Sequence, residues 1–271
     1  MSNPSNIDNA ERPDDRFGLL TKPVSVLMPV CNESDIIEQV VEEWHHDVIR
    51  FLPEGSELVF DDASDDQTPE ILKRLQRRYT YIRVHSSARD GFGNATKRLY
   101  LVAKNPLVFF VDSDGQYLAS DFWKLAEIFA CKEGGVDMLN GYKVDRKHPM
   151  YQIFGSWLFN VFVRQLFSSK GKDINSAFKL VKRDLLEKQV PRLKYVPTFV
   201  NSELYLRAEA EGYCIVDIPV SHRMRDSGKS KVSTPMSYLR HGWETIFGLI
   251  KLRKALNIQA ALERQKRVTL K

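Results

Sequence analysis

Short apolar segments alternate with segments of helical periodicity along the first 111 residues, and this alternation restricts the fold more than any other feature of the chain. Four apolar runs have the length of buried strands, at 24–30, 57–60, 81–84 and 107–111. The segments between them place apolar residues at helical spacing, beginning near Ser34, at Thr68 and after Arg89. Parallel strands that are joined through helices need right-handed crossovers. The pattern therefore predicts an α/β fold built on a mostly parallel sheet.

Local signals add detail to this pattern. Asp35 and Glu38 are spaced for a capping box at the start of the first helix, and Pro69 favours a helix start at Thr68. After residue 111 we expect a helix near 121–132 and a strand at 136–139. The segment 150–167 is apolar almost all round, so it belongs either in the core or in a membrane interface.

The segment 235–254 is amphipathic, aromatic and basic. Such a helix suits a membrane surface, although the same pattern serves a surface helix packed on a core. Its predicted apolar side comprises Tyr238, Leu239, Trp243, Ile246, Phe247 and Ile250. We therefore divide the chain into a flexible leader at 1–22, a single domain at 23–235 and a basic helical extension at 236–271.

Composition excludes several classes of protein. Hydrophobic residues make up 43% of the 271, which suffices for a core, so the chain is not intrinsically disordered. The apolar runs are shorter than the roughly 20 residues of a transmembrane helix, and the polar start lacks the layout of a signal peptide. We expect a cytoplasmic protein. The three cysteines predict neither disulfides nor a zinc site, and no nucleic-acid-binding motif accompanies the net charge of +5.

Two aspartates and a glutamine follow the strand predicted at 107–111. Asp112 and Asp114 project to the same side of an extended chain, as does Gln116 if the extension continues. Oxygen ligands at the end of a strand can hold Mg²⁺ or Mn²⁺ against a diphosphate. Taken alone, such a pair of aspartates is weak evidence, because the same pattern is common in solvated loops and helix caps.

Three polar segments each follow the carboxyl end of a predicted strand, so all three point to the same edge of the sheet. These are PVCNESD after the first strand, FDDASDDQT after the second and VDSDGQ after the fourth. The carboxyl ends of parallel strands meet at the edge where open α/β sheets bind ligands. In order and spacing the segments resemble family 2 glycosyltransferases, which have the GT-A fold.

Two later segments narrow the resemblance. RDSGKSK at 225–231 and DINSAFKLVKRD at 173–184 are similar to motifs of the branch that makes polyprenyl-phosphate sugars, as dolichol-phosphate mannose synthases do. In the second motif Ala177 replaces the usual glycine. The resemblance covers roughly residues 23–235 and implies a GT-A catalytic domain with a Rossmann-like nucleotide-binding sheet. It also implies a metal-dependent, inverting transfer from GDP-mannose or a UDP-sugar.

The resemblance implies a binding role for each matching residue. The nucleotide would be lined by Pro29, Cys31, Glu33, Phe60 and Asp62. Asp62 would accept a hydrogen bond from a ring N–H, which suits uracil or guanine. Of the four aspartates in the second segment, Asp61, Asp62, Asp65 and Asp66, at least two are expected only to cap the turn and the helix at Thr68.

The diphosphate end of the donor has its own set of implied contacts. Asp112, Ser113 and Asp114 would meet ribose, diphosphate and metal, and Gln116 would complete the ligands of the ion. Lys143 stands where the branch usually has an arginine, which keeps the charge but loses the bidentate geometry. Arg225 and Lys231 would clamp the phosphates as the donor binds.

The acceptor is indicated by a residue that is missing. Family members with hydroxyl acceptors carry a Glu-Asp pair as the base ahead of a helix, but this chain has Val200-Asn201 there. A phosphate acceptor is already anionic and needs no base, which favours a polyprenyl phosphate. The two amphipathic or apolar segments would then rest peripherally on the cytoplasmic face of a membrane, alone or with a membrane-anchoring partner.

Three alternatives remain. The nearest is a soluble glycosyltransferase of the same family that acts on a saccharide or another hydroxyl, with Glu203 as an unusual base. A nucleotidyltransferase would need a glycine- and lysine-rich phosphate loop after the first strand, which PVCNES lacks. A binding module without activity would not be expected to retain the complete set of implied catalytic residues, Asp112, Asp114, Arg225 and Lys231. The identity of the sugar is left open.

Overall fold

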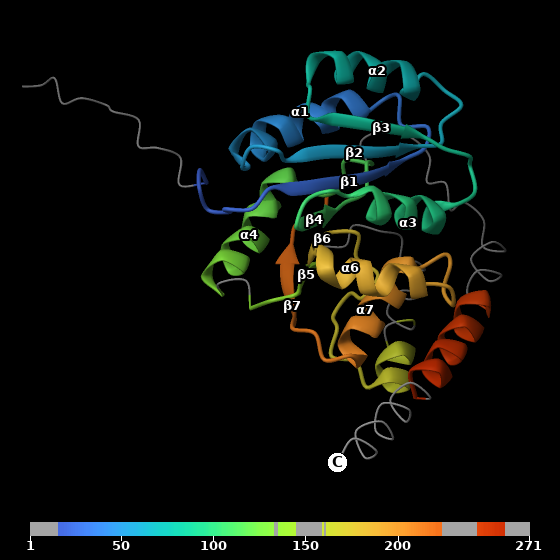
Figure 1. Ribbon diagram of the computed structural model, residues 1–271. Coiled ribbons are helices and arrows are strands. Elements are labelled where there is room, and N and C mark those ends of the chain that lie inside the picture. The colour runs from blue at the N-terminus through green and yellow to red at the C-terminus, as the bar shows by residue number, and fades with distance from the viewer. Residues whose placement is uncertain (1–15, 133–134, 145–158, 160, 224–242, 258–271) are drawn as a thin grey trace, which may run out of the picture.

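The computed structural model describes residues 16–132, 135–144, 159, 161–223 and 243–257. In this part of the chain seven strands form one sheet in the order β3-β2-β1-β4-β6-β5-β7, with helices packed around it (Figure 1). The strands are β1 (Val24–Val30), β2 (Glu57–Asp62), β3 (Ile82–Ser86), β4 (Leu107–Phe110), β5 (Met138–Lys143), β6 (Lys179–Lys182) and β7 (Ile215–Val220). The helices are α1 (Ile37–Asp47), α2 (Thr68–Arg78), α3 (Phe92–Val102), α4 (Phe122–Cys131), α6 (Arg183–Gln189) and α7 (Val200–Ala210). Short 3-10 turns lie at Ile49–Phe51, Ala119–Asp121 and Val190–Arg192.

Strand pairing confirms the mostly parallel sheet. β1 pairs in parallel with both β2 and β4, β2 pairs in parallel with β3, and β5 pairs in parallel with β7. Only β6 runs the other way, between β4 and β5. The carboxyl ends of the six parallel strands therefore meet at one edge of the sheet, together with the start of β6. Helix α1 contacts α2, whereas α3 contacts α6 and α7.

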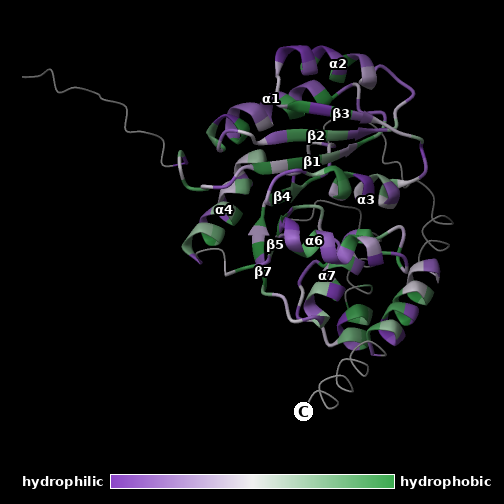
Figure 2. Ribbon diagram, in the orientation of Figure 1, coloured by the Kyte–Doolittle hydropathy of each residue, from purple (hydrophilic) through white to green (hydrophobic). Residues whose placement is uncertain are grey.

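The core forms where apolar strands meet the apolar sides of the helices. Every residue of β1 and β4 is buried, and hydrophobic residues lie along these strands and on the neighbouring helices (Figure 2). The ring of Phe109 in β4 lies 5.4 Å from that of Trp44 in α1 and 5.0 Å from that of Phe122 in α4. Burying one such side chain contributes about 1.5–3 kcal/mol, so these contacts fix both helices on the sheet.

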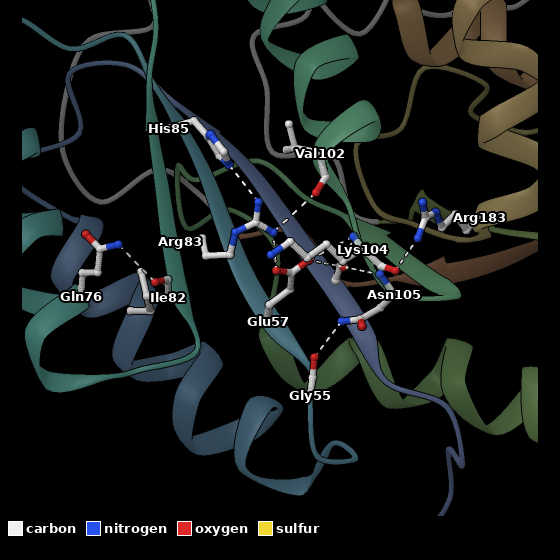
Figure 3. Close-up of polar contacts among 11 residues, drawn as sticks. Gly55, Glu57, Gln76, Ile82, Arg83, His85, Val102, Lys104, Asn105 and Arg183 are labelled. Atoms are coloured by element: carbon white, nitrogen blue, oxygen red, sulfur yellow. Dashed lines mark hydrogen bonds and ion pairs between the residues drawn. The ribbon is translucent and has the colours of Figure 1, made fainter.

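A polar network closes the amino-terminal edge of the sheet (Figure 3). Glu57, the first residue of β2, accepts hydrogen bonds from the Ser25 hydroxyl at 2.6 Å and the Lys104 N–H at 3.2 Å, and it pairs with Arg83 of β3. The Asn105 side chain donates to the carbonyl oxygen of Gly55 at 3.0 Å. These contacts tie the starts of three strands to the connection between α3 and β4.

Several local predictions need correction. The capping box at Asp35 and Glu38 is wrong: α1 begins at Ile37 and has no side-chain cap, because the Glu33 carbonyl accepts the Ile37 N–H instead. The strand predicted at 136–139 is β5, at Met138–Lys143, and β6 was not predicted. The helix start at Thr68 and the helix near 121–132 are confirmed. The leader was expected to be flexible to residue 22, but Leu20 is buried and the ring of Phe17 packs 4.8 Å from that of Phe51.

Residues 243–257 are helical and pack on the body of the protein by a side that the sequence did not indicate. The buried residues are Thr245, Gly248, Leu249, Leu252 and Leu256, whereas Trp243 and Phe247 are 62% and 60% exposed. A Cβ added to Gly248 would lie 2.2 Å from the Tyr195 carbonyl oxygen, so glycine allows this close approach.

Only part of the apolar 150–167 segment lies within the described residues. Residues 161–167 are helical, Val163 is buried, and the ring of Phe159 lies 5.5 Å from that of Phe199. The guanidinium of Arg253 lies 5.9 Å from the ring of Phe167, so this helix neighbours the one at 243–257. In the described part of the chain, no helix combines the length and apolarity required to cross a membrane.

Candidate active site

The polar segments that follow β1, β2 and β4 come together at the carboxyl edge of the sheet. In the register of the sheet Asp62 lies opposite Val30, and Phe110 lies opposite Leu27. Three residues past the end of β4, the Ser113 hydroxyl donates to the Pro29 carbonyl at 2.8 Å. The D-x-D-x-Q loop therefore lies beside the end of β1, and the sequence prediction of one shared edge is confirmed.

The four aspartates at the end of β2 and in the loop that follows it have separable roles. Asp61 receives two hydrogen bonds from Arg98 of α3, at 3.2 and 2.8 Å, and one from the Ser87 hydroxyl. Asp66 accepts the Thr68 and Ser34 N–H groups; burial opposes its ionisation, but these hydrogen bonds outweigh burial and lower its pKa to about 2. Asp65 pairs with Asn32 and Arg89 at the surface. Three of the four thus have structural partners.

Asp62 differs from these three. It accepts the Ser64 N–H at 3.1 Å, and no cation pairs with it in the part of the chain that the structure describes. Burial raises its pKa, with the charges of Asp66 and Asp61 adding to the effect. A desolvated carboxylate with spare acceptor capacity can receive a hydrogen bond from a ligand.

Asp112 and Asp114 lie in a loop that its own backbone braces. The Gln116 N–H donates to Asp114 Oδ1 at 3.1 Å. Gly115, between Asp114 and Gln116, has φ +69°. A Cβ there would also lie 2.8 Å from the side chain of Ile36, so the turn requires glycine. Burial, together with the charge of Asp112, raises the pKa of Tyr100 and of Tyr117, which keeps both phenols neutral.

The donor set in this loop fits a divalent ion that is shared with a ligand. No group of three or more His, Cys, Asp or Glu side chains suited to a metal occurs among the described residues. Two carboxylates with an amide oxygen nearby are what Mg²⁺ or Mn²⁺ takes when substrate phosphates and water supply the remaining ligands. Asp112, Asp114 and Gln116 would hold such an ion only together with a diphosphate.

The other predicted nucleotide contacts differ in how accessible they are. Phe60 is 0% exposed within β2, so its ring offers no open face to a base. Pro29 is buried in β1 and Glu33 is 9% exposed, whereas Cys31 is partly exposed and its thiol lies 3.5 Å from the Ala63 carbonyl. Because the Ser113 hydroxyl is engaged by Pro29, a ribose contact from Ser113 would use its backbone.

The predicted cationic residues are only partly described. Lys143, the last residue of β5, is half-buried, and its ammonium lies 4.9 Å from the centre of the Tyr117 ring. Tyr117 directly follows the D-x-D-x-Q loop, so Lys143 brings positive charge to this edge. Arg225 and Lys231 lie outside the described residues.

The first turn of α7 holds no available base. Asn201 is 1% exposed and its Oδ1 accepts the Tyr100 hydroxyl at 2.7 Å. Glu203 is 0% exposed and accepts the N–H groups of Lys194, Tyr195 and Val196 at 2.7–3.2 Å and that of Arg207 Nε at 3.0 Å. Glu203 therefore organises the loop before α7, against which α3 and the helix at 243–257 pack at Gly93 and Gly248.

Sequence reasoning missed several charged residues. Arg98 neutralises Asp61 from 37 positions away, a distance at which no local motif links the two. Lys179 opens β6 fully buried, with its ammonium bonded to Asn140 and to the Ile174 carbonyl. Burial lowers its pKa to about 7, although Asp173 and Asp217 act in the opposite direction. The lysine in DINSAFK was visible, but its burial was not.

Comparisons with known proteins agree with this geometry. A family model described as "Glycosyl transferase family 2" matches residues 25–189. The chain is 30% identical over 227 residues to "Glycosyltransferase AglD" of Haloferax volcanii, which covers 81% of this chain and 36% of that protein. The chain thus spans about a third of that relative. It is also 25% identical over 213 residues to "Dolichyl-phosphate hexose transferase" of the same organism, covering 77% of this chain and 86% of that protein.

A solved structure supports the fold. Glucosyl-3-phosphoglycerate synthase from Mycobacterium tuberculosis, crystallised with Mn²⁺, UDP and glucosyl-3-phosphoglycerate, superposes with a TM-score of 0.65. The match covers 86% of this chain and 81% of that chain at 18% identity. At this identity the likeness carries the fold alone, and it agrees with the GT-A architecture expected from the motifs.

Proposed function

The chain belongs to glycosyltransferase family 2, and from this premise we propose that it transfers a sugar from a nucleoside diphosphate sugar to a polyprenyl phosphate at the cytoplasmic face of a membrane. The donor is a GDP- or UDP-sugar. The transfer inverts the anomeric carbon, because the acceptor oxygen attacks opposite the leaving diphosphate.

The observation that carries the proposal is that neither Asn201 nor Glu203, at the start of α7, can act as a base. A hydroxyl acceptor must lose a proton to a base during attack. The neutral amide of Asn201 cannot take a proton there, and the Glu203 carboxylate is surrounded by three backbone N–H groups and Arg207. A phosphate acceptor arrives as an anion and needs no base. The substitution at Asn201 therefore supports a phosphate acceptor over a saccharide hydroxyl.

The donor is proposed to bind along the carboxyl edge of the sheet. Asp62 would accept the ring N–H of uracil or guanine, and Asp112, Asp114 and Gln116 would hold Mg²⁺ or Mn²⁺ against the diphosphate. The ion would stabilise the negative charge that grows on the leaving nucleoside diphosphate. Lys143, Arg225 and Lys231 would add positive charge to the same leaving group.

The membrane surface is proposed from the exposed side of the helix at 243–257. The rings of Trp243 and Phe247 lie 6.5 Å apart, and both are exposed although the opposite side of the helix is packed on the protein. Lys251 and Lys254 are exposed as well, at positions that fall near these rings on the helix. Aromatic rings beside lysines suit the headgroup region of an anionic leaflet, with or without an anchoring partner.

The proposed reaction is tested with radiolabelled GDP- and UDP-sugars, short-chain polyprenyl phosphate and Mg²⁺ or Mn²⁺, with EDTA as control. We expect label in the organic phase that EDTA abolishes, and the labelled donor identifies the sugar. Metal-dependent hydrolysis of the donor without a lipid product would overturn the lipid-phosphate proposal.

Membrane binding is tested by flotation with anionic liposomes. Trp243→Ala combined with Phe247→Ala should reduce the bound fraction at least several-fold. Leu101→Ala removes a side chain that is 64% exposed on α3 and serves as the matched control. Equal flotation of all three proteins would contradict the assigned surface, and no flotation of the wild type would contradict direct membrane binding.

A further inference from the structure

The chain segment after β7 is bonded to the D-x-D-x-Q loop along its backbone. The Arg223 N–H donates to the Gln116 carbonyl at 2.9 Å, and the Gln116 side-chain amide donates to the Arg223 carbonyl at 3.4 Å. In the adjacent positions of the two segments, Tyr117 and His222 form an antiparallel bridge. The two segments are separated by about a hundred residues in sequence, so this contact belongs to the tertiary structure of the site.

The Arg223 side chain adds a second connection to the same loop. Its Nε donates to the Gly115 carbonyl at 2.6 Å, and its Nη2 pairs with Glu43 of α1. Glu43 also accepts the Ala119 N–H at 3.0 Å through its other oxygen. Arg223 and Glu43 together therefore hold the loop at Gly115 and Gln116 from one side and at Ala119 from the other.

We propose that Glu43 and Arg223 are positioning residues that set the geometry of the metal-binding loop. The inference rests on the proposed function, because it assigns a task to residues around the proposed ligands Asp112, Asp114 and Gln116. Neither residue would contact the donor or the ion.

The loop offers a direct route for this effect. The N–H of Gln116 donates to Asp114, so a shift of the Gln116 backbone moves the carboxylate of Asp114. Gly115 allows the turn at φ +69°, but glycine has no side chain that could fix the turn in place. Ligands of a metal act within about 0.5 Å of their productive positions, and hydrogen bonds from surrounding residues keep them there. Charge-assisted hydrogen bonds such as those of Arg223 are the stronger kind.

The exposure of the pair agrees with a positioning role. The side chains of Arg223 and Glu43 are 34% and 19% exposed, so neither charge is deeply buried. Pairs that keep contact with solvent contribute less to the free energy of unfolding than deeply buried pairs do. Their removal should therefore change the loop more than it changes the stability of the fold.

The test measures binding of Mn²⁺ by electron paramagnetic resonance, with UDP or GDP present and without any acceptor. Glu43→Gln and Arg223→Ala are each expected to weaken Mn²⁺ binding about 10- to 100-fold, the usual effect of losing a residue that orients metal ligands. The double variant should lose less than the product of the two single losses, because Glu43 and Arg223 pair with each other as well as with the loop. Arg223→Lys keeps the charge without the two-pronged geometry and should fall between.

The matched control is another ion pair of α1. Glu38 pairs with Arg74 of α2 at 2.7 Å, away from the loop. Glu38→Gln and Arg74→Ala should leave Mn²⁺ binding unchanged, and all variants should unfold within a few degrees of the wild type. Mn²⁺ binding by Glu43→Gln and Arg223→Ala at wild-type strength would overturn the inference while leaving the donor site intact. If the wild type bound no Mn²⁺ with either nucleotide, the proposed donor site would be wrong, and this inference with it.

Discussion

The carboxylates of Glu57 and Asp62, at opposite edges of the sheet, differ in how they are partnered. At the amino-terminal edge the carboxylate of Glu57 is matched by Ser25, Arg83 and the Lys104 N–H (Figure 3). At the carboxyl edge Asp62 has no cationic partner among the described residues and its pKa is raised by burial, while Asp112 and Asp114 stand on one loop nearby. Glu57 with its partners stabilises the fold, whereas Asp62 keeps acceptor capacity that a ligand can use.

The largest expected effect comes from removing a carboxylate at the carboxyl edge. Asp114→Asn should lower the transfer rate about 10²- to 10³-fold, because one ligand of the ion that stabilises the leaving group is lost. Thermal unfolding should change little, since asparagine keeps an oxygen that can accept the Gln116 N–H. Asp65→Asn, at an exposed position on the same edge, is the control and should retain activity. A variant Asp114→Asn with full activity would remove the metal site from the account.

The reverse pattern is expected at the amino-terminal edge. Glu57→Ala leaves Arg83 and Ser25 without their shared acceptor and should lower the free energy of unfolding by about 3 kcal/mol. Transfer per folded molecule should be unchanged. Urea unfolding and initial rates measure the two quantities, with the exposed neighbour Glu54→Ala as control. A rate loss comparable to that of Asp114→Asn would mean that the two edges do not divide their roles in this way.

The adjacent residues Asp61 and Asp62 allow the same comparison within one strand end. Asp62→Asn should raise the KM for the donor about tenfold, the effect of losing one hydrogen bond to a charged acceptor, with kcat little changed. Asp61→Asn should mainly lower stability, because Arg98 loses a bidentate partner. Steady-state kinetics and thermal unfolding of both variants measure these effects. A raised KM in Asp61→Asn together with lower stability in Asp62→Asn would assign the contact with the nucleobase to Asp61.

A smaller effect is expected from the buried lysine of β6. The pKa of Lys179 is about 7 in the folded chain and near 10.4 when unfolded. Between these values the unfolded chain binds a proton that the folded chain lacks, so the free energy of unfolding should rise with pH. The slope is at most about 1.4 kcal/mol per pH unit. Lys179→Met should lack this slope in urea unfolding at pH 7.5 and 9, and equal slopes would show that Lys179 stays protonated.

The sequence predicted the parallel sheet because its signals are local. Apolar runs and helical spacing each span fewer than 20 residues, and three polar segments at strand ends follow from the same pattern. The partners of those segments were not predictable in this way. Arg98 meets Asp61 only after folding. The same holds for Arg223, which contacts Gly115 and Glu43. The sequence around these residues carries no motif that links them.

The side on which a helix packs was also hidden. The sequence placed Trp243 and Phe247 on the apolar side of their helix, but Leu249, Leu252 and Leu256 are the buried ones. The helix is apolar on two sides, so periodicity alone cannot choose between them. Likewise Glu203 reads as a possible base in sequence, and only its four donors identify it as structural.

The most direct test of a phosphate acceptor compares Glu203→Gln with the wild type on polyprenyl phosphate and on the matching polyprenol. The account predicts product from polyprenyl phosphate alone, and an unchanged kcat per folded molecule for Glu203→Gln despite its lower stability. Transfer to polyprenol, or chemistry abolished in Glu203→Gln with donor binding intact, would contradict it and identify a hydroxyl acceptor.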